Sequence, residues 1–349
     1  IFLVGVAHIL PFTFWSSYLI FALLTLANYW LFARRAEFFQ AIKAIWPRLL
    51  FAESIFLVAL FSWAYIHAFG PDAHGLEKYM DFGFVNSILR SEYFPPKDMW
   101  FTPFAINYYY FGHLVTAILT QLSLLPSSIT FNLMLSTIFA LCFSETFSIG
   151  ANLFFFMKGA KAASKVLRTI AGLLTAATVT LGGNLHMLYA FFKPYSVDKP
   201  QPIWELAFQP WTFPNAYWYP NATRYIYHTI HEFPIYSWIV ADLHGHVLDI
   251  PFVLLIVALL LSLFFRKDWH VQHEATHTKH LWLKQVCRVF STLTVHPGFL
   301  VFIGFLLAIM YMTNAWDGAI YLLLTIFVLA YLQWEHLIEK VPAKQQVWH

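Results

Sequence analysis

Charged side chains are scarce in this 349-residue chain. Asp, Glu, Lys and Arg make up only 11% of it, while 59% of the residues are hydrophobic. A soluble domain of this length cannot bury so much apolar surface, so the composition excludes a soluble globular protein. Aromatic residues reach 20%, and Trp and Tyr favour the headgroup level of a bilayer. We therefore expect an all-α polytopic membrane protein.

Cysteine is almost absent, and a Gly-rich phosphate loop is missing. The two cysteines, Cys142 and Cys287, lie in an apolar run and in a basic segment, so no disulfide framework is expected. Without a phosphate loop, the sequence predicts no nucleotide-binding domain. A net charge of +3 gives no reason to expect a nucleic acid partner. Because the chain begins inside an apolar run, we expect a fragment that forms one transmembrane domain over residues 1–349.

Seven apolar runs have the length of a membrane span. They cover residues 13–33, 49–69, 128–157, 169–192, 247–265, 297–313 and 319–336. Residues 1–11 resemble the end of an earlier span. Residues 107–125 form a further apolar run that periodicity alone does not assign.

The distribution of basic residues decides how residues 107–125 are interpreted. Lys and Arg cluster within residues 34–48, 158–168, 266–288 and 340–344. The positive-inside rule places all four clusters in the cytoplasm only if residues 107–125 do not cross the membrane. We therefore expect an interfacial or re-entrant helix there, on the outer side. The outer loops are then about residues 70–127, 193–246 and 314–318 of a multi-pass plasma membrane protein.

The first outer loop contains two acids at helical spacing, Glu77 and Asp81. In a helix both carboxylates share one face, which Phe84 and Ile88 continue. One interpretation is an amphipathic helix on the membrane surface. The other is that one carboxylate, beside low-dielectric lipid and a second acid, is a general base.

Asn107 and the three tyrosines Tyr108, Tyr109 and Tyr110 follow in the same loop, with His113 after them. We expect the tyrosines to cover most of a helix circumference. Their hydroxyls can bind sugar or headgroup oxygens, or the rings can form a simple aromatic belt.

The second outer loop carries a candidate cationic stripe. In a helix, Arg224, His228 and His231 share one face, which can hold a phosphate or be merely solvated. Glu232 follows, and Pro234 is expected to end this helix.

The stretch Asp242-Leu243-His244-Gly245-His246 has the residue types of a metal site. In an extended segment Asp242, His244 and His246 point the same way and suit a divalent ion such as Mn, Fe or Zn. Asp249 is either a supporting acid or a helix cap. In the last outer turn, Asn314 and Trp316 flank Asp317, which is either a third acid of the site or an ordinary helix N-terminal acid.

These motifs together resemble the archaeal and bacterial family known as the YYY membrane proteins, or DUF2298. The matching pieces are Glu77-Lys78-x-x-Asp81, Asn107-Tyr108-Tyr109-Tyr110-Phe111-Gly112, Glu232-Phe233-Pro234-x-x-Ser237, Asp242-Leu243-His244-x-His246 and Asn314-x-Trp316-Asp317.

The order of the elements also resembles the GT-C superfamily of membrane glycosyltransferases, which includes protein O-mannosyltransferases and aminoarabinose transferases. The resemblance implies a GT-C-like helix bundle whose outer loops carry an amphipathic helix and a juxtamembrane helix. Those enzymes use a polyprenyl-phosphate sugar donor. The same resemblance implies that Asp81 or Glu77 is the base. The Glu-x-x-x-Asp spacing departs from the paired acidic motif typical of that superfamily.

We therefore expect a glycosyltransferase whose site faces outside the cytoplasm, with membrane lipids, a polyprenyl-phosphate sugar and an acceptor as partners. Two other functions stay open: a transporter or channel that uses Glu145, and a non-catalytic envelope assembly protein. The candidate catalytic residues are Asp81, Glu77, Glu232 and Asp317; the candidate substrate-binding residues are Asn107, Tyr108, Tyr109, Tyr110, His113, Arg224, His228, His231, Asn314 and Trp316; the candidate metal ligands are Asp242, His244 and His246.

Overall fold

The computed structural model describes nine parts of the chain, all of them helical or irregular. They are residues 1–33, 35–159, 164–184, 186–193, 201–212, 223, 228–229, 231–265 and 295–339. Within them, β-pairing is limited to two isolated bridges. Five of the described helices are long and apolar enough to cross a membrane: Phe14–Phe32, Ala36–His67, Ser127–Lys158, Gly245–Phe265 and Ala315–His336. The chain is thus an all-α polytopic membrane protein, as its composition predicted.

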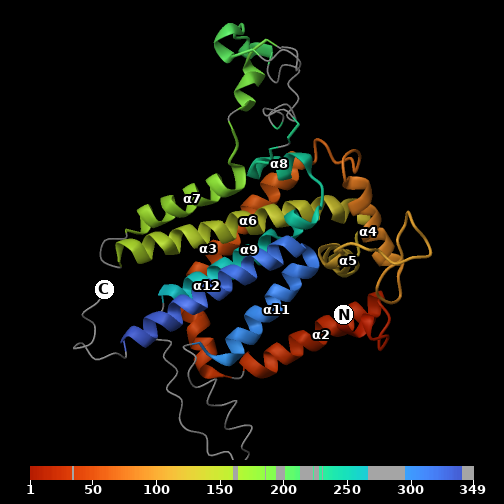
Figure 1. The fold of residues 1–349 in the computed structure, drawn as a ribbon, viewed down its shortest axis with the longest axis vertical. Helices are drawn as coiled ribbons and strands as arrows, with labels where there is room; N and C mark the ends of the chain where they lie inside the picture. The colour runs from red at the N-terminus through yellow and green to blue at the C-terminus, as the bar shows by residue number, and fades with distance from the viewer. Residues whose placement is uncertain are drawn as a thin grey trace, which may run out of the picture.

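The long helices alternate in direction through the bundle (Figure 1). They are α2 (Phe14–Asn28, extended by a π-helical turn, Tyr29–Ala33), α3 (Ala36–His67), α6 (Ser127–Lys158), α7 (Lys165–Leu181), α9 (Gly245–Phe265), α11 (Pro297–Thr313) and α12 (Ala315–Glu339). One end of the bundle carries the short helices α4 (Lys78–Arg90), α5 (Phe111–Ser123) and α8 (Pro234–Val240). We call it the α4 end. The helix ends next to all four basic clusters lie at the opposite end, as the charge distribution predicted.

Helix α5 runs across the bundle rather than along it. Figure 1 views α5 almost end-on, whereas α6, α9 and α12 lie across the picture. Its 13 residues span about 20 Å, too short for a hydrocarbon core of about 30 Å. Two bonds fix it to α2: Ser17 Oγ donates to Gln121 over 2.6 Å, and Tyr18 OH donates to the Leu122 carbonyl over 2.6 Å. The run 107–125 therefore does not cross.

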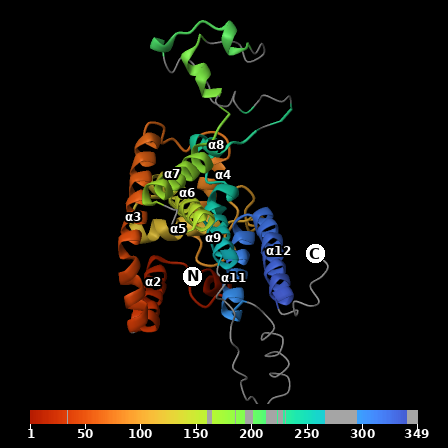
Figure 2. The ribbon, with the colours of Figure 1, turned by 90° about the vertical axis from the view of Figure 1, so that its left-hand side faces the viewer.

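The expected span at residues 169–192 is wrong. Helix α7 starts at Lys165 and ends at Leu181, where Gly182 terminates it. The Gly182 carbonyl then accepts a bond from the Ile235 amide over 3.2 Å, which draws the chain toward α8. Residues His186–Phe191 form a separate 3₁₀ helix that stands away from the bundle in both ribbon views (Figure 2). The sequence remains largely apolar after Gly182 and Gly183, but helix α7 ends before them.

Two other boundaries differ from expectation. The expected span 49–69 is the second half of a longer helix, α3, which starts at Ala36 and contains Pro47. The expected loop 314–318 is reduced to one residue, Asn314, because α11 ends at Thr313 and α12 begins at Ala315. Asp317 therefore lies in the first turn of α12.

An apolar core lies directly beneath the α4 end. Trp63 of α3 stacks on Phe139 of α6, with ring centroids 4.3 Å apart, and Trp238 of α8 meets Phe139 edge-on. Trp238 also donates from Nε1 to the Thr180 carbonyl over 2.8 Å, which ties α8 to α7. The same cluster includes Phe131, Leu135, Ile138, Leu243, Val247 and Leu248. This packed cluster lies under the polar residues of the α4 end.

Candidate active site

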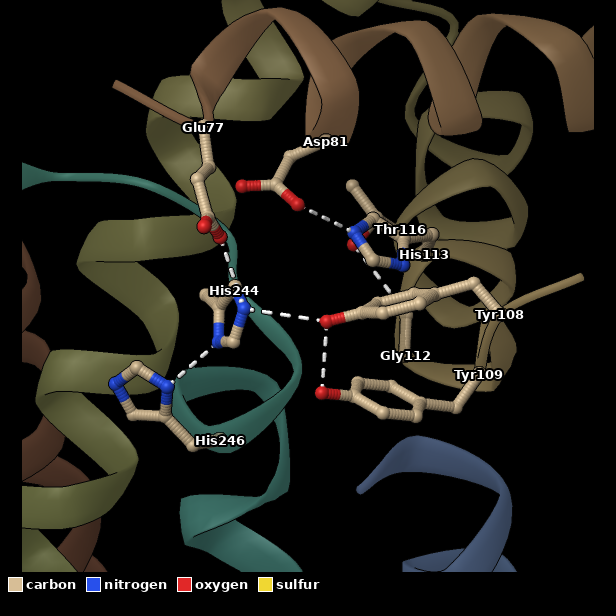
Figure 3. A network of polar contacts seen from close by, with 9 residues as sticks. All are labelled: Glu77, Asp81, Tyr108, Tyr109, Gly112, His113, Thr116, His244 and His246. Atoms are coloured by element: carbon tan, nitrogen blue, oxygen red, sulfur yellow. Dashed lines mark hydrogen bonds and ion pairs between the residues drawn. The ribbon is translucent and has the colours of Figure 1, made fainter. Parts of the chain in front are cut away.

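Four segments that are distant in sequence meet at the α4 end. They are the start of α4, the segment leading into α5, the stretch before α9, and the start of α12. Figure 3 shows Glu77 and Asp81 from α4 facing Tyr108, Tyr109 and His113 on one side and His244 and His246 on the other. The structure thus brings together residues that sequence analysis assigned to separate loops.

Asp81 and His113 form a buried pair. Asp81 is 0% exposed and His113 is 1% exposed, and His113 Nε2 lies 3.1 Å from Asp81 Oδ1. The partners come from the buried faces of α4 and α5, where Phe84 packs edge-on against the His113 ring. The second oxygen, Asp81 Oδ2, makes no hydrogen bond to any described residue. One oxygen is therefore held in place, and the other is buried without a hydrogen-bond partner among the described residues.

A second chain of contacts links two acids through two histidines. His244 Nε2 lies 2.9 Å from Glu77 Oε2, and His244 Nδ1 lies 2.7 Å from His246 Nδ1. His246 Nε2 lies 3.9 Å from Glu232 Oε2, at the far end. Glu77 and Glu232 are about half exposed, whereas His244 is mostly buried. This series of contacts therefore connects two accessible carboxylates, those of Glu77 and Glu232.

The partners of His244 assign the protons on both rings. A carboxylate only accepts hydrogen bonds, so Nε2 of His244 carries the proton toward Glu77. A neutral His244 then has a bare Nδ1, which accepts from the Nδ1–H of His246. This leaves Nε2 of a neutral His246 as the basic nitrogen, directed toward Glu232. A proton taken up there can be relayed along the two rings to Glu77.

Two of the three consecutive tyrosines join this network. Tyr108 OH lies 3.2 Å from His244 Nε2 and donates to Tyr109 OH over 2.7 Å. Burial, the Tyr109 bond and the nearby negative charges of Glu77 and Asp81 raise the pKa of Tyr108, so it stays a neutral donor. Tyr110 packs instead with Phe2 in a different aromatic cluster.

The expectation of a tyrosine-covered helix is wrong. Tyr108 and Tyr109 lie in an irregular segment, Tyr110 is the N-cap residue, and α5 starts only at Phe111. Asn107 is exposed and makes none of the contacts in the network. Consecutive residues in an irregular segment point in different directions, which separates Tyr110 from the other two.

Two glycines allow this close packing, and sequence analysis overlooked both. A Cβ on Gly245 would collide with the Tyr109 ring and would lie 2.8 Å from the Thr313 carbonyl oxygen. A Cβ on Gly112 would lie 2.7 Å from Leu248 Cβ. Gly112 therefore brings α5 onto α9, and Gly245 lets Tyr109 lie against the histidine segment. A glycine directly between two histidines was the available signal.

Asp242 lies in the same electrostatic environment. Burial, reinforced by the charges of Asp81 and Glu77 and opposed by His244, raises the pKa of Asp242 to about 6. Lys78 was also overlooked, although it sits between the two acids of α4 in sequence. Burial lowers the pKa of Lys78, and the charges of Asp242 and Asp72 oppose that shift. Lys78 is thus the cation beside this group of acids.

The predicted metal ligands make other contacts. Asp242, Leu243 and His244 precede α9 without regular structure, and side chains 242, 244 and 246 are the less buried ones in alternation with 241, 243, 245 and 247. His244 and His246 bond to each other and to glutamates. Among the described residues, no group of three His, Cys, Asp or Glu side chains is placed to hold a metal ion. A divalent metal at Asp242, His244 and His246 stays a prediction.

The start of α12 contributes an acid but not its tryptophan. Asn314 Nδ2 donates to Asp317 Oδ2 over 2.7 Å, and Asp317 lies within electrostatic range of His246. Asp249 of α9 is fully buried near Asp317, although neither of its oxygens forms a hydrogen bond with a described residue. Trp316 is 76% exposed.

The expected helix of the second loop does not form where the structure describes it. His228 has a positive φ of 60°, and His231 lies outside regular structure with its amide donating to the Thr223 carbonyl. Arg224 lies outside the described residues. Pro234, expected to end that helix, instead begins α8, because its fixed φ suits a first helical position.

Comparison with known proteins gives a family but no activity. No curated protein and no solved structure matches the chain. The family described as "Uncharacterized membrane protein (DUF2298)" matches residues 1–348. Because the match spans almost all of its residues, the chain belongs to the DUF2298 family of membrane proteins.

Proposed function

We propose that this protein is a membrane glycosyltransferase that uses a polyprenyl-phosphate-linked sugar donor. The observation that carries the proposal is Asp81, a fully buried carboxylate with one oxygen held by His113 and the other without a hydrogen-bond partner among the described residues. A general base must be oriented and must keep an acceptor lone pair available. Glu77, half exposed at the start of the same helix, is the second candidate base.

The proposed reaction is a transfer to an acceptor hydroxyl. The base, Asp81 first and Glu77 second, takes the proton of the acceptor hydroxyl, whose oxygen bonds to the anomeric carbon of the sugar. The bond between that carbon and the phosphate oxygen breaks, and its electron pair leaves on the polyprenyl phosphate. The cation of Lys78 stabilises the negative charge on the departing phosphate.

The remaining groups are assigned by position. Tyr108 and Tyr109 line the donor entrance, because the Tyr108 hydroxyl contacts His244 and the Tyr109 hydroxyl accepts a hydrogen bond from Tyr108. Glu232 and Asp317 complete the acidic wall around His246. His228, His231 and Arg224 belong to the loop that would contact the lipid phosphate.

The proposed location is the outer face of the plasma membrane. Helix ends beside all four basic clusters lie opposite the α4 end, and such clusters mark the cytoplasmic side. Helix α5, lying across the bundle at the α4 end, is placed like an interfacial helix. A lipid-linked donor in the outer leaflet would therefore reach the acids without entering the bundle.

Transport through Glu145 is less well supported. Along α3, α6 and α9 the residues follow one order: the α4-end network first, then the apolar core, then Glu145 and its surroundings. Phe131, Leu135 and Ile138 are at most 1% exposed and occupy that core. A tightly packed apolar layer interrupts the continuous polar path that a transporter needs.

The test is sugar transfer by protein reconstituted in lipid vesicles with radiolabelled polyprenyl-phosphate mannose, glucose and arabinose. We expect transfer from one donor and at least a hundredfold loss in the Asp81→Asn/Glu77→Gln double variant, as expected for removal of a general base. Glu92→Gln, an exposed acid of the same loop, is the matched control. Full activity in the double variant would refute the assignment of the base.

A further inference from the structure

A second polar region lies on the far side of the apolar core from the α4 end, and it opens at the surface of the bundle, where Glu53, Asn152 and Ser262 are exposed. It is a cavity of about 610 Å³ between α3, α6 and α9, a volume typical of small-molecule sites. Its polar lining comes from all three helices: Glu53 of α3, Ser144, Glu145, Ser148 and Asn152 of α6, and Ser262 of α9. Phe56, Leu141, Leu254 and Leu261 are among its apolar walls.

The polar groups of α6 form one stripe. Ser144, Ser148 and Asn152 repeat every four residues, which places them on one face of the helix, and Glu145 lies beside them. This stripe lies within a helix long and apolar enough to cross a membrane. A row of oxygen-bearing side chains in such a helix is costly and marks a functional region.

The fold itself does not use the two carboxylates of this cavity. Glu145 Oε2 is buried and makes no hydrogen bond to any described residue. Neither Glu145 nor Glu53 takes part in an ion pair within the described parts of the chain. At the α4 end, every acid that forms an ion pair does so with a histidine. Glu145 and Glu53 differ because neither has such a partner among the described residues.

We propose that this cavity binds an amphiphilic amine. The ammonium group lies between Glu145 and Glu53 and donates to the serine hydroxyls, while the alkyl part packs on Phe56, Leu141 and Leu254. The polar groups that line the cavity are two carboxylates, three hydroxyls and one amide, whose oxygens can accept hydrogen bonds from the three donors of an ammonium. A bare inorganic cation would leave most of the volume and all the apolar wall unused.

Arg168 lies at the Asn152 edge of the cavity, where it is a cation in contact with a lining residue. Arg168 of α7 donates from Nη2 to Asn152 Oδ1 over 2.5 Å and also lies over the Phe155 ring, 4.9 Å from its centroid. Arg168 does not reach the glutamates through any described ion pair. It therefore repels a second cation at the edge and leaves the ammonium position at Glu145 uncompensated.

The experiment measures binding of radiolabelled octylammonium to the purified chain in phosphatidylcholine nanodiscs, with empty nanodiscs subtracted. We expect one saturable site per protein. Loss of a charged hydrogen bond predicts at least about tenfold weaker binding in Glu145→Gln. Glu335→Gln, which removes an exposed acid of α12, should bind as the unaltered protein does.

Two further arms decide the ligand class. Octyl sulfate should fail to compete, since it places a negative charge beside two carboxylates, and Glu53→Gln should weaken octylammonium binding as well. An absence of saturable binding overturns the proposal. So does equal affinity in Glu145→Gln protein that unfolds at an unchanged temperature. Displacement of octylammonium by dilute sodium chloride would also overturn it. This site is independent of the proposed glycosyltransferase activity.

Discussion

The two polar regions of this protein hold acids in opposite ways. At the α4 end, Asp81, Glu77 and Glu232 each face a histidine, over 3.1, 2.9 and 3.9 Å. In the cavity between α3, α6 and α9, the other polar groups among the described lining residues are hydroxyls and one amide. The first region is compensated within the protein and can move protons between its own residues. The second is compensated only by something that enters it.

The comparison explains why one region suits catalysis and the other binding. A histidine beside a carboxylate can take or release a proton near neutral pH, so the α4 end can serve as acid and base without a ligand. A carboxyl without a partner in a membrane-spanning helix gains from a cation or a proton. The apolar core around Phe139 keeps the two regions separate.

The largest expected effect comes from making the α4 end resemble the cavity. His113→Leu leaves Asp81 buried without its partner, which typically costs about 3–5 kcal/mol. We expect the unfolding temperature in detergent to fall sharply. The Asp81→Leu/His113→Leu double variant should recover most of the loss. Equal stability of the single and double variants would mean that the pair is unimportant.

A smaller effect, with a definite sign, is expected for Asp242. Its pKa is raised in the folded protein to about 6 from an ordinary value near 4, so the unfolded chain releases this proton first as pH rises. The folded state binds more protons between these values, and stability therefore decreases from about pH 4 to pH 6, by about 2 kcal/mol. Asp242→Asn should remove this decrease, whereas the exposed control Glu92→Gln should keep it. Denaturant unfolding at several pH values measures it.

The cavity should respond in the opposite direction. Glu145→Leu replaces an unpartnered buried carboxyl by an apolar side chain, and such replacements are often neutral or stabilising, here by about 1 kcal/mol. We expect a higher unfolding temperature for the ligand-free protein. The reverse result, a clear destabilisation, would show that Glu145 is compensated within the fold and would remove the contrast between the two regions.

The smallest effect tests the division among the tyrosines. Tyr108→Phe removes a hydroxyl bonded to His244 and Tyr109, at about 1 kcal/mol. Tyr110→Phe is the matched control, because its ring packs with Phe2 outside the network. We expect only Tyr108→Phe to reduce sugar transfer, with a larger effect on KM than on kcat. Equal effects of both changes would contradict the division.

Much of the architecture followed from the sequence alone. Apolar runs predicted the membrane helices, and the basic clusters predicted that residues 107–125 do not cross. The sequence places Gly182 and Gly183 at the end of α7, inside a run whose apolar composition predicted a span up to residue 192. The grouping of Glu77, Asp81 and His244 could be anticipated only as residues on the same side of the membrane.

The sequence by itself determined which segments cross the membrane and which end of the bundle carries the acids, because hydrophobic length and charge decide both. The pairing was decided only by the tertiary structure. His113 meets Asp81 because α5 lies across the bundle, and Tyr109 meets the histidine segment because Gly245 leaves room for its ring. These pairings depend on helix directions and close contacts between distant segments. Such contacts arise from packing, which no local pattern of residues encodes.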